Sequence, residues 1–108
     1  MSDRELLKLA AKAAGIRINY WLYDDLDYSA AVLETSEIWH PLADGSDALS
    51  LAVKLGLTVA QLITSREVYV FCYHEETVEM YEDYGTDPDA ATRLAITRAA
   101  AEVGRNMK

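Results

Sequence analysis

Apolar side chains occupy both faces of a β-strand that we predict for residues 67–74. Side chains alternate across a strand. One face therefore carries small apolar groups at Val68, Val70 and Cys72, and the other carries aromatic rings at Tyr69, Phe71 and Tyr73. A strand with one face in water has polar residues on that face. We therefore expect this strand to be covered on both sides.

Apolar positions at helical spacing predict three helices, at residues 2–14, 44–55 and 87–104. Residues that favour helix N-caps stand at their beginnings, namely Ser2, Asp44 or Ser46, and Asp87. Glycines that favour the left-handed stop follow at Gly15, Gly56 and Gly104. In the second helix we expect the buried positions to be Ala48, Leu49, Ala52, Val53 and Leu55.

Shorter runs rich in aromatic and β-branched residues predict strands at residues 16–23, 28–35, 57–63, 67–74 and 77–82. Residues 24–27 form an acidic turn between the first two, which are expected to pair as a hairpin. For residues 57–63, a continuation of the preceding helix competes with a strand. Residues 37–42 are read as an ordered connection, because Pro41 blocks ladder pairing.

This order of elements, helix–strand–strand–helix–strand–strand–strand–helix, predicts one α+β domain over residues 1–108. Short connections favour a mainly antiparallel sheet of about five strands with helices on both faces, a three-layer α/β/α sandwich. The second and third helices are expected to share one face of the sheet. The first helix is expected to cover the other face.

Two stretches, residues 39–55 and 87–101, resemble the phage ABA-sandwich domain family of small uncharacterised prophage proteins. The resemblance implies a phage origin and a helix–sheet–helix arrangement. That family carries no established activity and no catalytic residues, so the resemblance assigns no site in this chain.

The formal net charge of −8 argues against direct binding to nucleic acid or to anionic membranes. No apolar run approaches the roughly 18–20 residues that a membrane crossing needs. Residues 1–5 are charged and do not resemble a signal peptide. Because Cys72 is the single cysteine, we expect a reducing compartment, the cytoplasm of a bacterial host.

Chemistry-bearing groups are sparse. Cys72 and His74 share one strand face, but two ligands are too few for a structural zinc site and their spacing suits a catalytic pair poorly. The carboxylates gather in expected turns and strand ends, and no glycine-rich phosphate loop is present. We therefore expect no metal, no cofactor and no enzymatic activity.

The surplus of aromatic residues is the remaining signal. Tyrosine and tryptophan anchor protein interfaces, while acidic surroundings disfavour the stacking of RNA bases. The alternative is a second core layer beneath the first helix. The interface candidates are Trp21, Tyr23, Tyr69, Phe71, Tyr73 and Tyr81, with Asp24, Asp25 and Asp27 in the acidic turn.

These observations favour a phage-derived, non-enzymatic protein that binds a host or phage macromolecule, in particular a basic protein, through an acidic and aromatic surface. A two-fold homodimer through the same surface is an open alternative. A second hypothesis is the sequestering of a nucleotide-like small molecule. Its positive charge could come from Arg17, Arg66, Arg93 and Arg98.

Overall fold

The computed structural model describes residues 2–22, 30–73 and 77–107. Its elements, in chain order, are α1 (Asp3–Ala14), β1 (Ile18–Trp21), β2 (Ala31–Leu33), β3 (Ile38–Trp39), α2 (Gly45–Leu55), β4 (Thr58–Leu62), β5 (Glu67–Tyr73), β6 (Thr77–Asp83) and α3 (Pro88–Arg105). The strands form two antiparallel sheets, β1-β2-β3 and β4-β5-β6. The α+β class is confirmed, whereas two small sheets replace the expected single sheet of about five strands.

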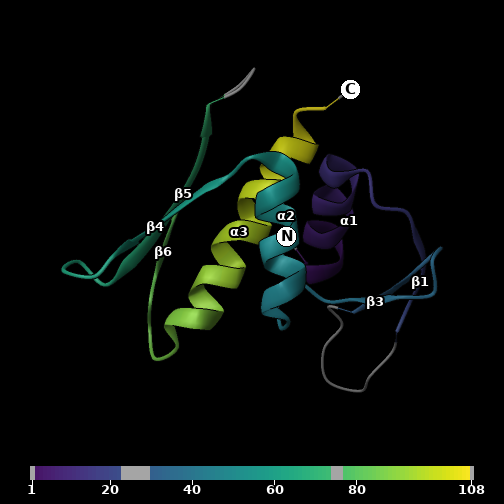
Figure 1. The fold of residues 1–108 in the computed structure, drawn as a ribbon, viewed down its shortest axis with the longest axis horizontal. Coiled ribbons are helices and arrows are strands. Elements are labelled where there is room, and N and C mark those ends of the chain that lie inside the picture. Colours follow the sequence, from purple (N-terminus) through teal and green to yellow (C-terminus); the bar gives the residue numbers. More distant parts are fainter. Residues whose placement is uncertain (1, 23–29, 74–76, 108) are drawn as a thin grey trace.

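The helices lie between the two sheets (Figure 1). α3 packs against β5 and β6, while α1 and α2 pack against other sides of α3. In the described residues, helices therefore cover only one face of the β4-β5-β6 sheet. The expected α/β/α sandwich was wrong because α1 buries its apolar stripe against α3 instead of against the strands.

Small side chains explain why α3 can be surrounded in this way. Its buried positions are mostly alanines, and the longer ones are Ile96 and Thr97. The Thr97 hydroxyl donates to the Arg93 carbonyl at 2.8 Å, so this buried polar group is satisfied. Among the helices that the structure describes, none combines the length and the apolar character needed to cross a membrane.

The expected helix beginnings are confirmed by their caps. The side chains of Ser2, Asp44 and Asp87 accept hydrogen bonds from backbone N–H groups in the first turns of α1, α2 and α3. Gly15 and Gly56 adopt left-handed φ angles of 69° and 63° at the ends of α1 and α2. α3 ends at Arg105, near Gly104 as expected, but Gly104 is not its stop, because the C-cap is Asn106 with a right-handed φ of -83°.

The strand predictions need one addition. β1 and β2 pair as the expected hairpin, and residues 58–62 form a strand and not a helix extension. Residues 37–42, read as a connection without pairing, contain β3, which pairs with β2. Pro41 lies beyond the end of β3, so it does not interrupt that ladder.

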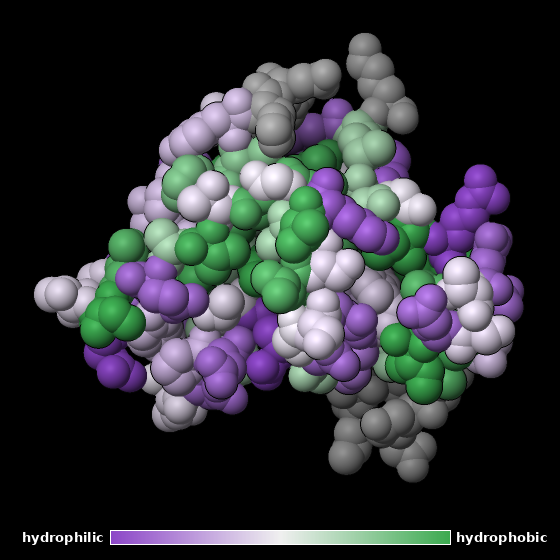
Figure 2. Space-filling view, viewed as in Figure 1, coloured by the Kyte–Doolittle hydropathy of each residue, from purple (hydrophilic) through white to green (hydrophobic). Residues whose placement is uncertain are grey.

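The expected burial of α2 was partly wrong: Ala48 and Ala52 are buried as expected and Leu55 packs against the core, but the two other expected positions are exposed. Leu49 is 61% exposed and Val53 is 73% exposed, whereas Leu51 is fully buried. α2 turns its alanine-containing face towards α3, because small side chains permit a closer approach. Figure 2 shows apolar side chains gathered on the front of the molecule, where α2 lies in Figure 1.

Candidate binding face of the β4-β5-β6 sheet

The outer face of the β4-β5-β6 sheet consists of the side chains that point away from α3. Strand register arranges them in rungs across the sheet. The rungs are Leu62–Glu67–Asp83, Ala60–Tyr69–Tyr81, Thr58–Phe71–Glu79 and Tyr73–Thr77. Three of these rungs contain an aromatic ring. Figure 1 shows no described element on this side of the sheet.

Four of these rings form a continuous row of ring contacts, which we call the aromatic row: Tyr81, Tyr69, Phe71 and Tyr73. The centroid of the Tyr69 ring lies 4.4 Å from that of Tyr81 at an interplanar angle of 15° and 4.7 Å from that of Phe71 at 28°. The Phe71 and Tyr73 centroids are 5.1 Å apart. Stacked neighbours cover both faces of the Tyr69 ring. Each end ring, Tyr81 and Tyr73, has one neighbour in the row, and among the described residues no further ring stacks on it.

Exposure of the aromatic row increases towards its ends. Tyr73 is 59% exposed and Tyr81 is 53% exposed, whereas Tyr69 and Phe71 are half-buried by their neighbours. We expected this face to be covered, either by α1 or by another chain. α1 packs on α3, so within the described residues the row faces solvent. A contiguous apolar surface of this kind marks interaction sites in many proteins.

The charged groups on the outer face are acidic. They are Glu67, Glu79 and Asp83, and the outer-face rungs contain no lysine or arginine. Glu67 lies directly opposite Asp83 in the ladder, and like charges in register destabilise a sheet. Glu79 lies opposite Phe71. The face therefore combines apolar rings with uncompensated negative charge.

Hydrogen bonding at the centre of the row makes the Tyr69 hydroxyl harder to deprotonate. The Tyr69 and Tyr73 hydroxyl oxygens lie 3.2 Å apart. This hydrogen bond, together with desolvation and the nearby Glu79 carboxylate, raises the pKa of Tyr69 above its usual range. Tyrosine is uncharged at neutral pH even without this shift, so the negative charge of the face comes from its carboxylates.

The structure brings together only some of the predicted interface residues. Tyr69, Phe71, Tyr73 and Tyr81 share the outer face as expected. Trp21 does not join them, because β1 belongs to the other sheet; the Arg4 guanidinium carbon lies 5.3 Å from the centroid of its ring. Tyr23, Asp24, Asp25 and Asp27 lie outside the described residues.

Sequence reasoning missed the acidic members of the face. Glu67, Glu79 and Asp83 share it because β5 and β6 pair in the register that places Tyr69 opposite Tyr81. Alternation along each strand could have shown that each acid shares a face with a tyrosine of its own strand. Only the strand pairing joins the two sets into one surface.

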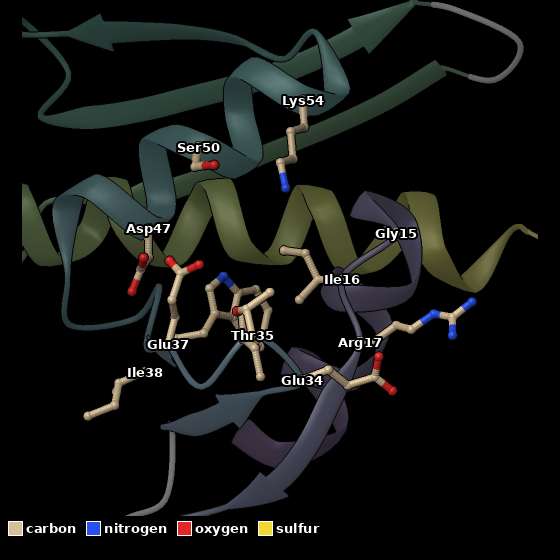
Figure 3. Close-up of a pocket in the computed structure, with 12 residues that line it drawn as sticks. Gly15, Ile16, Arg17, Glu34, Thr35, Glu37, Ile38, Asp47, Ser50 and Lys54 are labelled. Atoms are coloured by element: carbon tan, nitrogen blue, oxygen red, sulfur yellow. The ribbon is translucent and has the colours of Figure 1, made fainter.

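A pocket of about 390 Å³ lies elsewhere, between the α1–β1 connection, the β2–β3 hairpin and α2. Figure 3 shows the Lys54 side chain reaching towards Ile16, with Glu37 and Asp47 together on the other side of the pocket. The Asp47 carboxylate accepts a hydrogen bond from the His40 backbone N–H at 2.8 Å. Acidic and basic groups therefore mix around this pocket.

The arginines do not converge on that pocket. Arg17 lines it, but the other three expected suppliers of positive charge have partners elsewhere. These partners are the Gly85 carbonyl for Arg66, the Leu42 carbonyl for Arg93 and the Glu82 carboxylate for Arg98. The pocket also has three carboxylates, from Glu34, Glu37 and Asp47, against Arg17 and Lys54. This charge balance suits an anionic nucleotide poorly.

The described residues contain no cluster of three or more His, Cys, Asp or Glu side chains that could hold a metal ion. Cys72 is buried, and its sulfur lies 3.9 Å from the Leu55 carbonyl oxygen. His74, the other member of the expected pair, lies outside the described residues.

Comparison of this chain with protein-family models, curated proteins and solved structures found no match. The phage origin implied by residues 39–55 and 87–101 therefore stays a prediction.

Proposed function

We propose that this chain is a non-enzymatic binding protein of phage origin that holds a basic protein partner on the outer face of its β4-β5-β6 sheet. The observation that carries the proposal is the aromatic row, four rings in contact on a sheet face that no described element covers. Tyrosine rings supply large contact area at low entropic cost, and for this reason tyrosine is common at interface hot spots.

The negative charge of the outer face indicates which class of partner would bind there. Glu67, Glu79 and Asp83 share the outer face with the rings, and the whole chain carries a net charge of −8. These groups attract a basic protein and repel the phosphates of nucleic acid. A second copy of the chain is a poorer partner, because two outer faces in contact would bring these acids together without a cation.

The test is photo-crosslinking in host cells, with a photoreactive phenylalanine analogue replacing Tyr73 or Tyr81. Both side chains are more than half exposed, so the replacement should leave the fold intact. We expect a protein partner to cross-link at both positions. A cross-link yield that falls when cell lysate is irradiated at rising salt would show that carboxylates contribute to binding.

Matched controls use the apolar side chains on α2. The analogue at Leu49 or Val53 should not capture the same protein, although both side chains are exposed. The double variant Tyr73→Ala/Tyr81→Ala should lose the partner, while Leu49→Ala/Val53→Ala should keep it. Capture that survives the first double variant and fails with the second would overturn the proposal and move the interface to α2.

A second candidate function rests on the pocket beside α2. Its volume of about 390 Å³ suits a small molecule, and Arg17 and Lys54 supply positive charge. A thermal-shift screen of small metabolites tests this function; nucleotides belong in the screen as the ligands expected from the sequence, although the three carboxylates of the lining disfavour them. A rise in Tm that disappears in Lys54→Met would support it, and no rise with any compound would contradict it.

A further inference from the structure

We infer that the free edge of β6 binds an extended, arginine-bearing segment of the partner as a fourth strand. Side chains at every second position of that segment would lie beside Asp83, Tyr81 and Glu79 on the outer face. The inference rests on the proposed function, and it specifies which part of the face is used and what chemistry the partner presents.

The backbone of β6 is available for pairing. β6 is the last strand of the β4-β5-β6 order and pairs with β5 on one side; no other strand in the described residues pairs with it. It is seven residues long, so its outward edge offers a continuous series of N–H and C=O groups. Peptides commonly bind by adding a strand to an edge of this kind.

Side-chain charge distinguishes β6 from the opposite edge. On the outer face β6 carries the exposed acids Glu79 and Asp83. β4 carries only Thr58, Ala60 and Leu62 there, with no charge. A basic strand is therefore drawn to β6, whereas an uncharged strand would have no electrostatic reason to prefer it. The same acids hinder pairing of β6 with β6 of a second copy.

Ring geometry places a cation site beside Tyr81. Tyr69 stacks on one face of the Tyr81 ring, which leaves the opposite ring face directed away from β5. Directly opposed side chains on neighbouring strands have Cβ atoms about 4.5–5.5 Å apart. An arginine opposite Tyr81 can therefore stack its guanidinium group on that opposite ring face, with Glu79 and Asp83 on either side.

Binding of the segment would also reduce an electrostatic repulsion within the sheet. Glu67 and Asp83 face each other as like charges, and no described cation lies on the outer face. A basic side chain beside Asp83 would extend that rung and compensate the repulsion. The complementary pattern is a basic residue at every second position over about five residues, with β-branched residues between.

The experiment uses a fluorescent peptide of the length of β6, with arginine at every second position and threonine or valine between. Anisotropy gives its Kd for the full chain, and amide chemical shifts locate the site. We expect binding with the largest shifts in β6. A citrulline peptide, which keeps the shape and loses the charge, should bind roughly tenfold more weakly or worse.

A modified peptide and a protein variant distinguish the contribution of backbone pairing to binding from that of side-chain charge. A peptide whose backbone nitrogens are methylated along one edge lacks the N–H donors of that edge, so it should lose binding if the peptide pairs with β6 as a strand. The double variant Glu79→Gln/Asp83→Asn should weaken binding by roughly tenfold. Its control is Glu5→Gln/Asp89→Asn, which removes the same charge from exposed positions outside the outer face and should leave Kd unchanged.

Equal affinity of the arginine and citrulline peptides, or shifts confined to β4, would overturn the inference. No binding at about 1 mM arginine peptide would also overturn it. The proposed function would stand in these cases if Tyr73 and Tyr81 still cross-link a partner in cells. Loss of the cross-links as well would contradict both the inference about β6 and the proposed function.

Discussion

Gly104 of α3 lies directly against the backbone of Leu9 in α1. A β-carbon added to Gly104 would lie 2.8 Å from the Leu9 carbonyl carbon and closer still to its oxygen. The absence of a side chain at this position therefore sets how closely α1 and α3 approach. The close contact belongs to the packing of α1 on α3, and in that arrangement α1 does not cover the outer face of the β4-β5-β6 sheet.

Gly104→Ala should destabilise the fold strongly. The added methyl group meets backbone and cannot be relieved by a rotamer change, so we expect a loss of about 3 kcal/mol in the free energy of unfolding, or more. Urea unfolding followed by circular dichroism measures the loss. Gly45→Ala is the control, because a β-carbon there meets nothing within 4 Å. Equal effects of the two substitutions would contradict the close helix contact.

Leu51→Ala and Leu49→Ala test which side of α2 is buried. Leu51 is fully buried, so truncation leaves a cavity and should lower the free energy of unfolding by about 2–5 kcal/mol. Leu49 is 61% exposed, and its truncation should change stability by about 0.5 kcal/mol or less. A larger stability loss for Leu49→Ala than for Leu51→Ala in urea unfolding would contradict this burial and support the burial of Leu49 expected from the sequence.

Tyr84→Phe removes a hydroxyl that joins the sheet to α3. The Tyr84 hydroxyl donates to Gln61 Oε1 at 2.6 Å, and Gln61 Nε2 donates to Thr92 Oγ1 at 3.0 Å. Loss of the hydroxyl leaves Oε1 without its donor, so we expect a cost of about 1 kcal/mol. Tyr81→Phe, at an exposed position, should cost almost nothing. Equal unfolding free energies for the two variants would show that the Tyr84 hydrogen bond contributes nothing.

Asp83→Lys should stabilise the free protein and impair binding of the basic segment. The substitution turns a like-charge rung into an attractive one, because the new ammonium group faces the Glu67 carboxylate, for a gain of about 0.5 kcal/mol at low salt. Asp83→Asn, which removes the repulsion without adding attraction, should gain less. Urea unfolding measures stability and anisotropy measures binding. A loss of stability in Asp83→Lys would refute the repulsion between Glu67 and Asp83.

Tyr69 should make stability depend on pH in alkaline solution. Hydrogen bonding to Tyr73 raises its pKa in the folded state, so the folded chain holds this proton more tightly than the unfolded chain. The resulting stabilisation is complete below about pH 10 and is lost as pH rises through the folded-state pKa. Between about pH 8 and about pH 11, the Tyr69→Phe variant should therefore lose less stability than the unsubstituted protein.

The same prediction has a direct spectroscopic readout. In Tyr73→Phe the hydroxyl partner is gone, so the pKa of Tyr69 should fall towards its ordinary value. Titration of the Tyr69 ring carbon signal by NMR follows this change. An unchanged pKa in Tyr73→Phe would mean that the hydrogen bond is not its main cause.

Part of the candidate face could be predicted from the sequence. Strand alternation placed Tyr69, Phe71 and Tyr73 on one face, and the short connection to residues 77–82 brought Tyr81 beside them. Trp21 was assigned to the same surface because a single sheet was expected. The sequence offers no local signal for which strands share a sheet, since that depends on contacts between distant segments.

The local elements of this protein were determined by its sequence. The caps at Ser2, Asp44 and Asp87 and the strand pattern from Glu67 onward act over a few residues, through hydrogen bonds and side-chain alternation that operate before any packing. The tertiary structure decided the rest. Small side chains let α1 and α2 pack on α3, with Gly104 against Leu9, and that packing separates the two sheets and leaves the aromatic row facing solvent.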